Sequence, residues 1–179
     1  PWTEGRQWND EWITKSTRRF VAWGPAMDRN NLMLNQVNIL FGSVPDDLDD
    51  FVFASQSVQA EAMKYFVEMW RSRKFERTGI IWWNVRDGWP IISDAVVDYY
   101  GSKKLAYYFL QNVQKNVCLL INDPVDGAYP LVAVNDTRLP AEGTVTVTDV
   151  ATGKEVFKGS YNVGPNGRQC VSNLPVMKG

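Results

Sequence analysis

The chain has 179 residues, of which 45% are hydrophobic and 22% charged, and its formal net charge is −1. These values are typical of globular domains, and the balanced charge argues against a basic nucleic-acid-binding surface. No apolar run reaches the roughly 18 residues that a membrane span needs. With no histidine and two cysteines, the sequence lacks the usual ligands of a zinc site and excludes a Ser-His or Cys-His catalytic pair.

The first half of the chain carries all eight tryptophans and reads as helices around one short strand. Apolar residues at helical spacing predict a helix over 28–41, with Asp28 as its N-cap, and a longer one over 50–73. The wholly apolar run 80–83 predicts a strand buried on both faces, as in a parallel sheet. A third helix is expected over 103–114, capped by Ser102. Helix, buried strand and helix together indicate an α/β unit.

After residue 114 the pattern changes to short β-rich runs separated by turn residues. The predicted strands are 117–121, 131–134, 144–148, 156–161 and 169–174. This pattern is typical of an antiparallel sandwich, of which an immunoglobulin-like domain needs about seven strands. We therefore expect an incomplete sandwich. Cys118 and Cys170 both fall in predicted strands; a disulfide is conceivable, and a free buried thiol is the favoured alternative.

The candidate chemistry lies where the predicted strand 80–83 emerges into a loop, at Trp83, Asn84, Asp87 and Trp89. Parallel barrels build their active sites at this end of their strands. An aromatic face beside hydrogen-bonding groups suits a sugar, whose C–H groups pack on the ring. In the alternative interpretation the tryptophans are strand core and Asp87 caps the next turn. Spacing alone favours that alternative.

Residues 83–108 closely resemble the last barrel strand and following helix of glycoside hydrolase family 2, in its β-mannosidase-like branch. The match is carried by Trp83, Asp87, Trp89, Pro90, Ser93, Asp98, Tyr99, Tyr100, Gly101, Lys104 and Tyr108. Residues 54–62 resemble the helix before that strand, and 132–137 the start of the family's carboxy-terminal sandwich. Arg86 and Asp94 stand where many β-mannosidases have Asn and Trp, which leaves the sugar open.

The resemblance implies an α/β barrel fragment, the last helix–strand–helix of a TIM barrel, over 1–115. An all-β immunoglobulin-like sandwich, incomplete, is expected over 116–179. The resemblance also implies a retaining glycosidase with two catalytic Glu residues about 5–5.5 Å apart. Neither Glu4 nor Glu11 follows an apolar strand, so we expect both carboxylates upstream of Pro1 and an inactive isolated chain.

Within the glycone pocket that the resemblance implies, Trp83 is expected to be the sugar platform. Asn84 and Asp87 either hydrogen-bond sugar hydroxyls or hold the rim in place, and Trp89 packs within that rim. The expected partners are a carbohydrate of β-mannoside or β-galactoside type and the remainder of the barrel, with no cofactor, metal, nucleic acid or membrane.

Uncovered strand edges and helix faces predict self-association or marginal stability of the isolated chain. A non-catalytic carbohydrate-binding or structural module is the rival interpretation. The residues leave the compartment open; a polysaccharide-degrading parent favours the periplasm or secretion.

Overall fold

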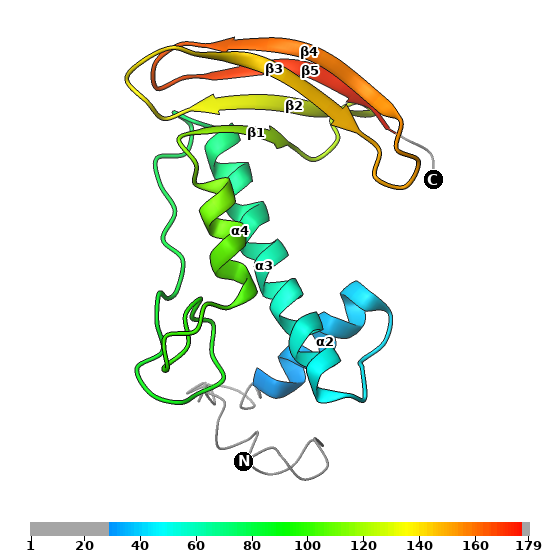
Figure 1. The fold of residues 1–179 in the computed structure, drawn as a ribbon, viewed down its shortest axis with the longest axis vertical. Coiled ribbons are helices and arrows are strands. Elements are labelled where there is room, and N and C mark those ends of the chain that lie inside the picture. Colours follow the sequence, from blue (N-terminus) through cyan, green and yellow to red (C-terminus); the bar gives the residue numbers. More distant parts are fainter. Residues whose placement is uncertain (1–28, 177–179) are drawn as a thin grey trace. The chain divides into compact units, whose positions relative to one another are not determined.

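The computed structural model describes residues 29–176, in two compact units (Figure 1). The first unit contains 29–64 and Ile81–Leu110, and the second contains Tyr65–Ile80 and 111–176. The predicted N-cap Asp28 and the carboxylates of Glu4 and Glu11 lie outside the described residues. The domain boundary after residue 115 stays a prediction.

The two predicted N-terminal helices are confirmed as α2 (Arg29–Phe41) and α3 (Leu48–Ser72). Helix α2 ends at Gly42, whose φ of 79° is a conformation that glycine adopts without a Cβ penalty. Helix α3 begins two residues earlier than predicted because Asp47 is its cap. The Oδ1 atom of Asp47 accepts the backbone N–H groups of Asp49 at 2.9 Å and Asp50 at 3.3 Å.

The core of the first unit lies where α2, α3 and the segment around Ile92 meet. Val37, Phe51 and Ala54 are buried at its centre. The partly buried side chains packed around them are Met33, Leu34, Val44, Leu48, Val58 and Ile92. The amphipathic spacing that predicted the two helices therefore also selects the residues that hold them together. No described helix is long and apolar enough to cross a membrane.

The predicted strand over 80–83 is wrong for this structure: these residues form no strand, and Ile81 is 98% exposed. A parallel strand needs neighbours for its backbone ladder, and no described strand lies beside this segment. Backbone hydrogen bonding begins directly after this segment, at Asn84 and Val85. The backbone N–H groups of Val96 and Val97 donate to the carbonyls of Asn84 at 3.2 Å and Val85 at 3.0 Å.

The third helix, α4 (Leu105–Val113), starts two residues later than predicted, so Ser102 is not its cap. The free N–H of Leu105 donates to Oε1 of Gln56 on α3, at 2.8 Å. A side chain 49 residues away in sequence thus satisfies the first turn of α4.

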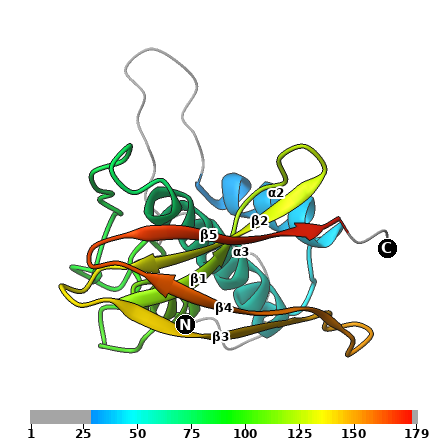
Figure 2. The same cartoon turned by 90° about the horizontal axis from the view of Figure 1, so that it is seen from above.

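The second unit contains the five predicted strands as antiparallel pairs in two sheets (Figure 2). One sheet has the order β1-β2-β5 and the other pairs β3 with β4. The bounds are β1 Val117–Ile121, β2 Ala128–Asn135, β3 Ala141–Thr148, β4 Glu155–Val163 and β5 Arg168–Pro175. The tight β3–β4 connection is a hairpin, closed by the Gly153 N–H donating to the Asp149 carbonyl at 2.8 Å.

Strand β2 is buried on both faces, because residues 131–135 are all buried. Leu131 packs with Val145 and Leu174, which joins the two sheets into a sandwich. Val132 and Val134 point to the other face and cluster with residues of β1, including Cys118. Both cysteines are free, Cys118 buried and Cys170 exposed, so the conceivable disulfide is not formed.

Candidate functional site

Trp83 lies at the wall of a cavity of about 530 Å³ in the first unit. Helices α2 and α3 supply most of the lining, in which apolar side chains are joined by Gln36, Ser55, Gln56 and Gln59, and Ser93, Asp94 and Lys104 add further polar groups. Trp83 itself is 76% exposed, so most of its indole has no protein packed on it. A cavity of this size, apolar with a few polar groups, has the dimensions of a small-molecule site.

Asp87 is buried next to this cavity and is paired with a cation. Its side chain is 2% exposed and accepts a bond from Nζ of Lys104 at 3.2 Å. The hydroxyl of Ser93 donates to the other carboxylate oxygen. Both oxygens therefore have protein partners, and in this structure the carboxylate ties the loop after Trp83 to the start of α4.

Asn84 presents the opposite situation, because its side-chain Oδ1 is buried and has no hydrogen-bond partner in the structure. A buried acceptor without a donor is destabilised by about 1–3 kcal/mol relative to a bonded one. Its backbone carbonyl is satisfied by Val96, and the peptide bond from Trp83 to Asn84 is cis. Asn84 is not among the residues that line the cavity, and its buried oxygen keeps an unused acceptor position.

Trp89 is not among the residues that line the cavity, and it is 49% exposed. Of the four predicted site residues, the structure thus brings Trp83 to the cavity and pairs Asp87 with the cavity-lining Lys104, whereas Asn84 and Trp89 are not among the lining residues. Among residues 29–176 no group of three or more His, Cys, Asp or Glu side chains could hold a metal ion.

Comparison with curated proteins shows sequence similarity to fungal β-mannosidases. Beta-mannosidase B of Aspergillus niger is 30% identical over 142 residues, which is 68% of this chain and 17% of that protein. Beta-mannosidase B of Aspergillus terreus is 36% identical over 70 residues, 37% of this chain and 8% of that protein. The chain is a relative of the glycoside hydrolases of family 2. No protein-family profile matches it.

Solved structures of family 2 enzymes share the fold of this chain. The β-D-mannosidase of Dictyoglomus thermophilum superimposes with a TM-score of 0.66 at 24% identity, over 80% of this chain and 18% of that one. The exo-chitosanase of Amycolatopsis orientalis gives a TM-score of 0.68 at 20% identity, over 95% and 21% of the two chains. The chain spans 17% of the length of the curated β-mannosidase that it matches over 142 residues.

The sequence alone did not predict which residues hold the loop after Trp83 in place. Lys104 was identified only as one of the positions that match the family, whereas in the structure it pairs with Asp87. No role was predicted for Gln59, whose Nε2 donates to the Asp94 carbonyl at 2.6 Å, or for Gln56. The presence of Asp87, Ser93 and Lys104 in one matched motif was the available signal, but only the fold shows that the three meet.

Proposed function

We propose that this chain is part of a retaining glycoside hydrolase acting on β-linked sugars of the β-mannoside or β-galactoside type, in which it supplies part of the glycone pocket. The observation that carries the proposal is the exposed indole of Trp83 at a cavity backed by the buried Asp87–Lys104 pair. An uncovered aromatic face on a firmly bonded segment is what stacking of a sugar ring requires. The similarity to β-mannosidase B supports the same reaction class.

Each site residue then has a proposed role. Trp83 is the platform under the sugar, and the unpaired Oδ1 of Asn84 accepts a bond from a sugar hydroxyl. Asp87 holds the rim in place, because Ser93 and Lys104 already occupy both of its oxygens. Trp89, half-exposed and not among the lining residues, packs in the rim.

The proposal includes the setting of this segment in a larger protein. The first 115 residues belong to the carboxy-terminal part of a (β/α)8 barrel, and the five strands begin an immunoglobulin-like sandwich. In that setting residues 80–83 gain strand neighbours and Ile81 is covered. Parallel barrels place their active sites at the C-terminal ends of such strands, which would put Trp83 at the barrel mouth.

The two catalytic Glu residues are proposed to lie upstream of Pro1. In a retaining mechanism one acts as nucleophile and the other as acid and base, through an oxocarbenium-like transition state. The flattened, positively charged ring of that state lies more closely on an indole face than the ground-state chair does. Contact with Trp83 therefore strengthens as the reaction proceeds and contributes to kcat.

The experiment compares two exposed aromatics in the full-length protein that contains this chain. Trp83 and Tyr100 are 76% and 77% exposed, but only Trp83 lines the cavity. We expect Trp83→Ala to lower kcat/KM on 4-nitrophenyl β-mannoside or β-galactoside at least tenfold, about 1.4 kcal/mol of transition-state stabilisation. Tyr100→Ala should stay within about twofold, a difference of roughly 0.4 kcal/mol. Unchanged kinetics in a folded Trp83→Ala protein would show that Trp83 packs in the fold and does not contribute to catalysis.

The purified 179-residue chain is expected to hydrolyse neither substrate. Turnover by this chain that Glu4→Gln or Glu11→Gln abolishes would refute the upstream position of the carboxylates. Sugar binding by a chain whose full-length protein has no glycosidase activity would instead support the non-catalytic carbohydrate-binding module.

A further inference from the structure

The ion pair between Asp87 and Lys104 joins the two ends of the loop that follows Trp83. The side chains are 2% and 16% exposed, and Nζ of Lys104 also donates to the Ser93 carbonyl at 3.2 Å. A buried ion pair seldom stabilises a fold more than apolar residues of the same size would, because both charges lose their hydration. Its presence at this place therefore calls for a reason other than stability.

Lys104 is also connected to Asn84 through the backbone. Its N–H donates to the carbonyl of Val96 at 2.9 Å, and the N–H of Val96 donates to the carbonyl of Asn84 at 3.2 Å. The Val96 side chain is buried, so this path is shielded from water. The carbonyl of Asn84 belongs to the peptide bond with Val85, directly after Trp83, so a shift of Lys104 displaces the backbone segment that carries the indole.

The loop is held on α3 by two glutamines, which makes Lys104 part of a fixed frame. Gln59 donates to the Asp94 carbonyl at 2.6 Å, and Gln56 accepts the N–H of Leu105, the residue after Lys104. The hydroxyl of Ser93, which bonds Asp87, also accepts the N–H of Ala95 at 3.0 Å. Helix α3, these two glutamines and the ion pair thus together hold the loop that follows Trp83.

We infer that Lys104 is a positioning residue of the glycone pocket: through Asp87, Ser93 and Val96 it fixes the orientation of Trp83 and the placement of the Asn84 oxygen. The inference rests on the proposed function for its catalytic consequence, but the positioning itself is a property of the described residues. Lys104 acts on the bound sugar through these residues. Its loss therefore lowers the fraction of productive complexes more than it lowers affinity.

The kinetic test uses neighbouring lysines in the full-length protein. Lys104→Met removes the charge and keeps the length, and Lys103→Met is the matched control, because Lys103 is exposed and lies over the ring of Tyr107 at 4.5 Å. We expect Lys104→Met to lower kcat about 100-fold with KM little changed, the effect of a misplacement of about 1 Å. Lys103→Met should keep kcat within about twofold of the wild-type value. A Lys104→Met protein with wild-type kcat would overturn the inference.

The double variant Asp87→Asn/Lys104→Met separates positioning from folding. Removing both charges avoids leaving one of them buried without its partner, so the double variant should regain the stability that Lys104→Met loses. If kcat stays low while the melting temperature recovers, the pair positions the site. If kcat recovers together with the melting temperature, the pair is structural only and the inference is wrong.

A spectroscopic readout stands apart from catalysis. In the full-length protein labelled with 5-fluorotryptophan, the Trp83 resonance is assigned by its loss in Trp83→Phe. Lys104→Met should shift or broaden that resonance and Lys103→Met should leave it in place; an unmoved Trp83 resonance in Lys104→Met contradicts the inference. A wild-type protein without activity on any β-glycoside would contradict the proposed function. The Trp83 resonance would still test whether Lys104 positions the indole.

Discussion

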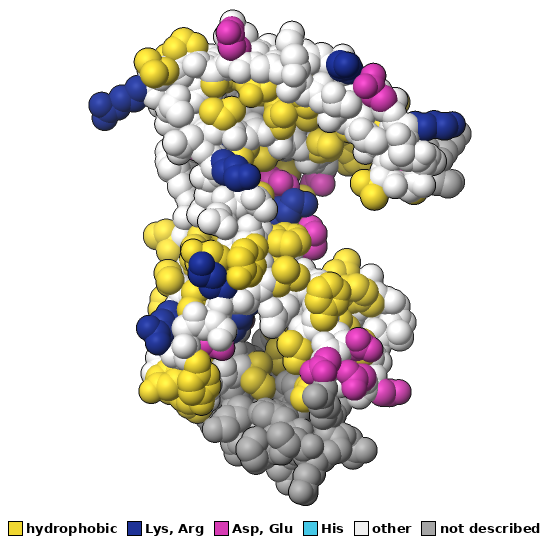
Figure 3. All heavy atoms as spheres, in the orientation of Figure 1, with side chains coloured by type: hydrophobic (Ala, Val, Ile, Leu, Met, Phe, Trp, Pro, Cys, Tyr) yellow, Lys and Arg dark blue, Asp and Glu magenta, His cyan; other side chains and the backbone are white. Residues whose placement is uncertain are grey.

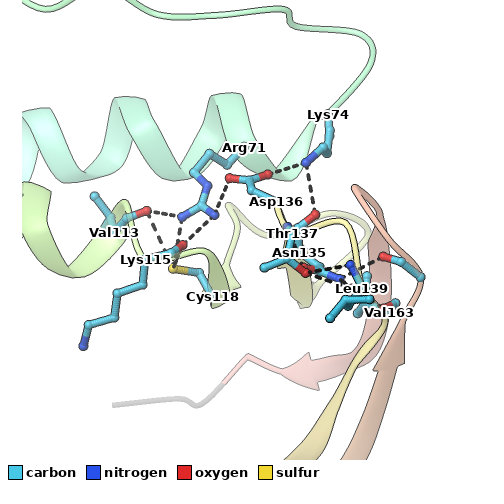
Figure 4. Close-up of polar contacts among 11 residues, drawn as sticks. Arg71, Lys74, Val113, Lys115, Cys118, Asn135, Asp136, Thr137, Leu139 and Val163 are labelled. Atoms are coloured by element: carbon cyan, nitrogen blue, oxygen red, sulfur yellow. Dashed lines mark hydrogen bonds and ion pairs between the residues drawn. The ribbon is translucent and has the colours of Figure 1, made fainter.

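Arg71, near the end of α3, donates from Nη2 to the carboxylate of Asp136, directly after β2, at 2.7 Å (Figure 4). Lys74 also pairs with Asp136, and its Nζ donates to the Asn135 carbonyl at 3.1 Å. The two cations are 12% and 14% exposed and the carboxylate 43%. Because Arg71 also donates to the Lys115 carbonyl at 2.8 Å, this network fixes the end of α3 to the sandwich.

We expect Asp136→Asn to destabilise the purified chain by about 1–3 kcal/mol, because it leaves two largely buried cations without a counter-charge. Urea unfolding followed by circular dichroism measures the difference. Asp126→Asn is the control, since Asp126 is exposed in a turn whose left-handed conformation asparagine also accepts. Equal unfolding free energies for the two variants would show that the network contributes nothing to stability.

The same contacts predict a pH dependence. Burial raises the pKa of Asp136, but the hydrogen bond from Lys74 and the charges of Arg71 and Lys74 outweigh it and hold the pKa below its ordinary value of 3.8. The unfolded chain therefore takes up this proton at a higher pH than the folded one. The stabilisation is fully present above 3.8 and is lost as the pH falls through the lower folded value.

Unfolding free energies between about pH 6 and pH 2 should thus fall more steeply for the wild type than for Asp136→Asn, with the difference confined to the region below about pH 4. Subtracting the two curves removes the contribution of the other carboxylates. Parallel curves below pH 4 would contradict the assignment.

At Asn135, replacing the side-chain nitrogen by oxygen is expected to lower the unfolding free energy substantially. Asn135 is 0% exposed, and its Nδ2 donates to the carbonyls of Leu139 at 2.7 Å and Gly164 at 3.0 Å. Asn135→Asp replaces these donors by a carboxylate oxygen that faces carbonyl oxygens, so we expect a loss of more than about 2 kcal/mol in unfolding free energy. Asn162→Asp, an exposed strand position, should change it by less than about 0.5 kcal/mol. Similar losses would show that the buried network tolerates the charge.

The sequence was sufficient to predict the elements whose signal is local. Helices α2 and α3 follow from apolar spacing, and the five strands follow from β-rich runs between turn residues. The strand predicted over residues 80–83 is wrong because an apolar run does not form a strand by itself: its backbone needs paired neighbours, and no described strand supplies them. The start of α4 was predicted two residues too early for a related reason: its first N–H is satisfied by Gln56 on another helix.

The candidate site shows the same division. The residue types Trp83, Asn84 and Asp87 suggested a sugar pocket because aromatic and polar groups follow one another at the end of an apolar run. Which of the polar groups is free could not be predicted, because it depends on Lys104, 17 residues after Asp87, reaching the carboxylate. The fold decides this: Asp87 is occupied and the Asn84 oxygen has no partner.

Gly159 on β4 is predicted to tolerate no side chain. A Cβ at this position would meet the ring of Phe157 at 2.6 Å, and that ring packs in the core that joins the two sheets. Gly159→Ala should therefore destabilise the chain by about 1–3 kcal/mol, the range for overpacking. At Gly79, which has no described atom within 4 Å of an added Cβ and no positive φ, alanine should be neutral or slightly stabilising. Equal thermal stability of the two variants would contradict this reading of the core.

The exposed apolar side chains of the first unit predict self-association of the isolated chain. Hydrophobic side chains gather at the surface around α2 (Figure 3); Ile39 is 74% exposed and Phe53, on α3, 66%. Burying such surface between copies is favourable by roughly 25 cal/mol for each Å² removed from water, and large exposed patches are uncommon on monomers. We therefore expect light scattering to show dimers or larger species at micromolar concentration.

Charge placed on this surface should reverse the effect, because an ammonium group would lose its hydration in the contact. Ile39→Lys and Phe53→Lys are expected to move the population toward monomer. Val150→Lys is the control: Val150 is 99% exposed, but it lies in the β3–β4 connection of the second unit. A shift of the same size in the control would mean that added charge acts through general solubility. A monodisperse wild-type monomer that melts cooperatively above roughly 60 °C, the upper part of the usual range for mesophilic domains, would contradict both the self-association and the proposal that these helices pack against further barrel strands.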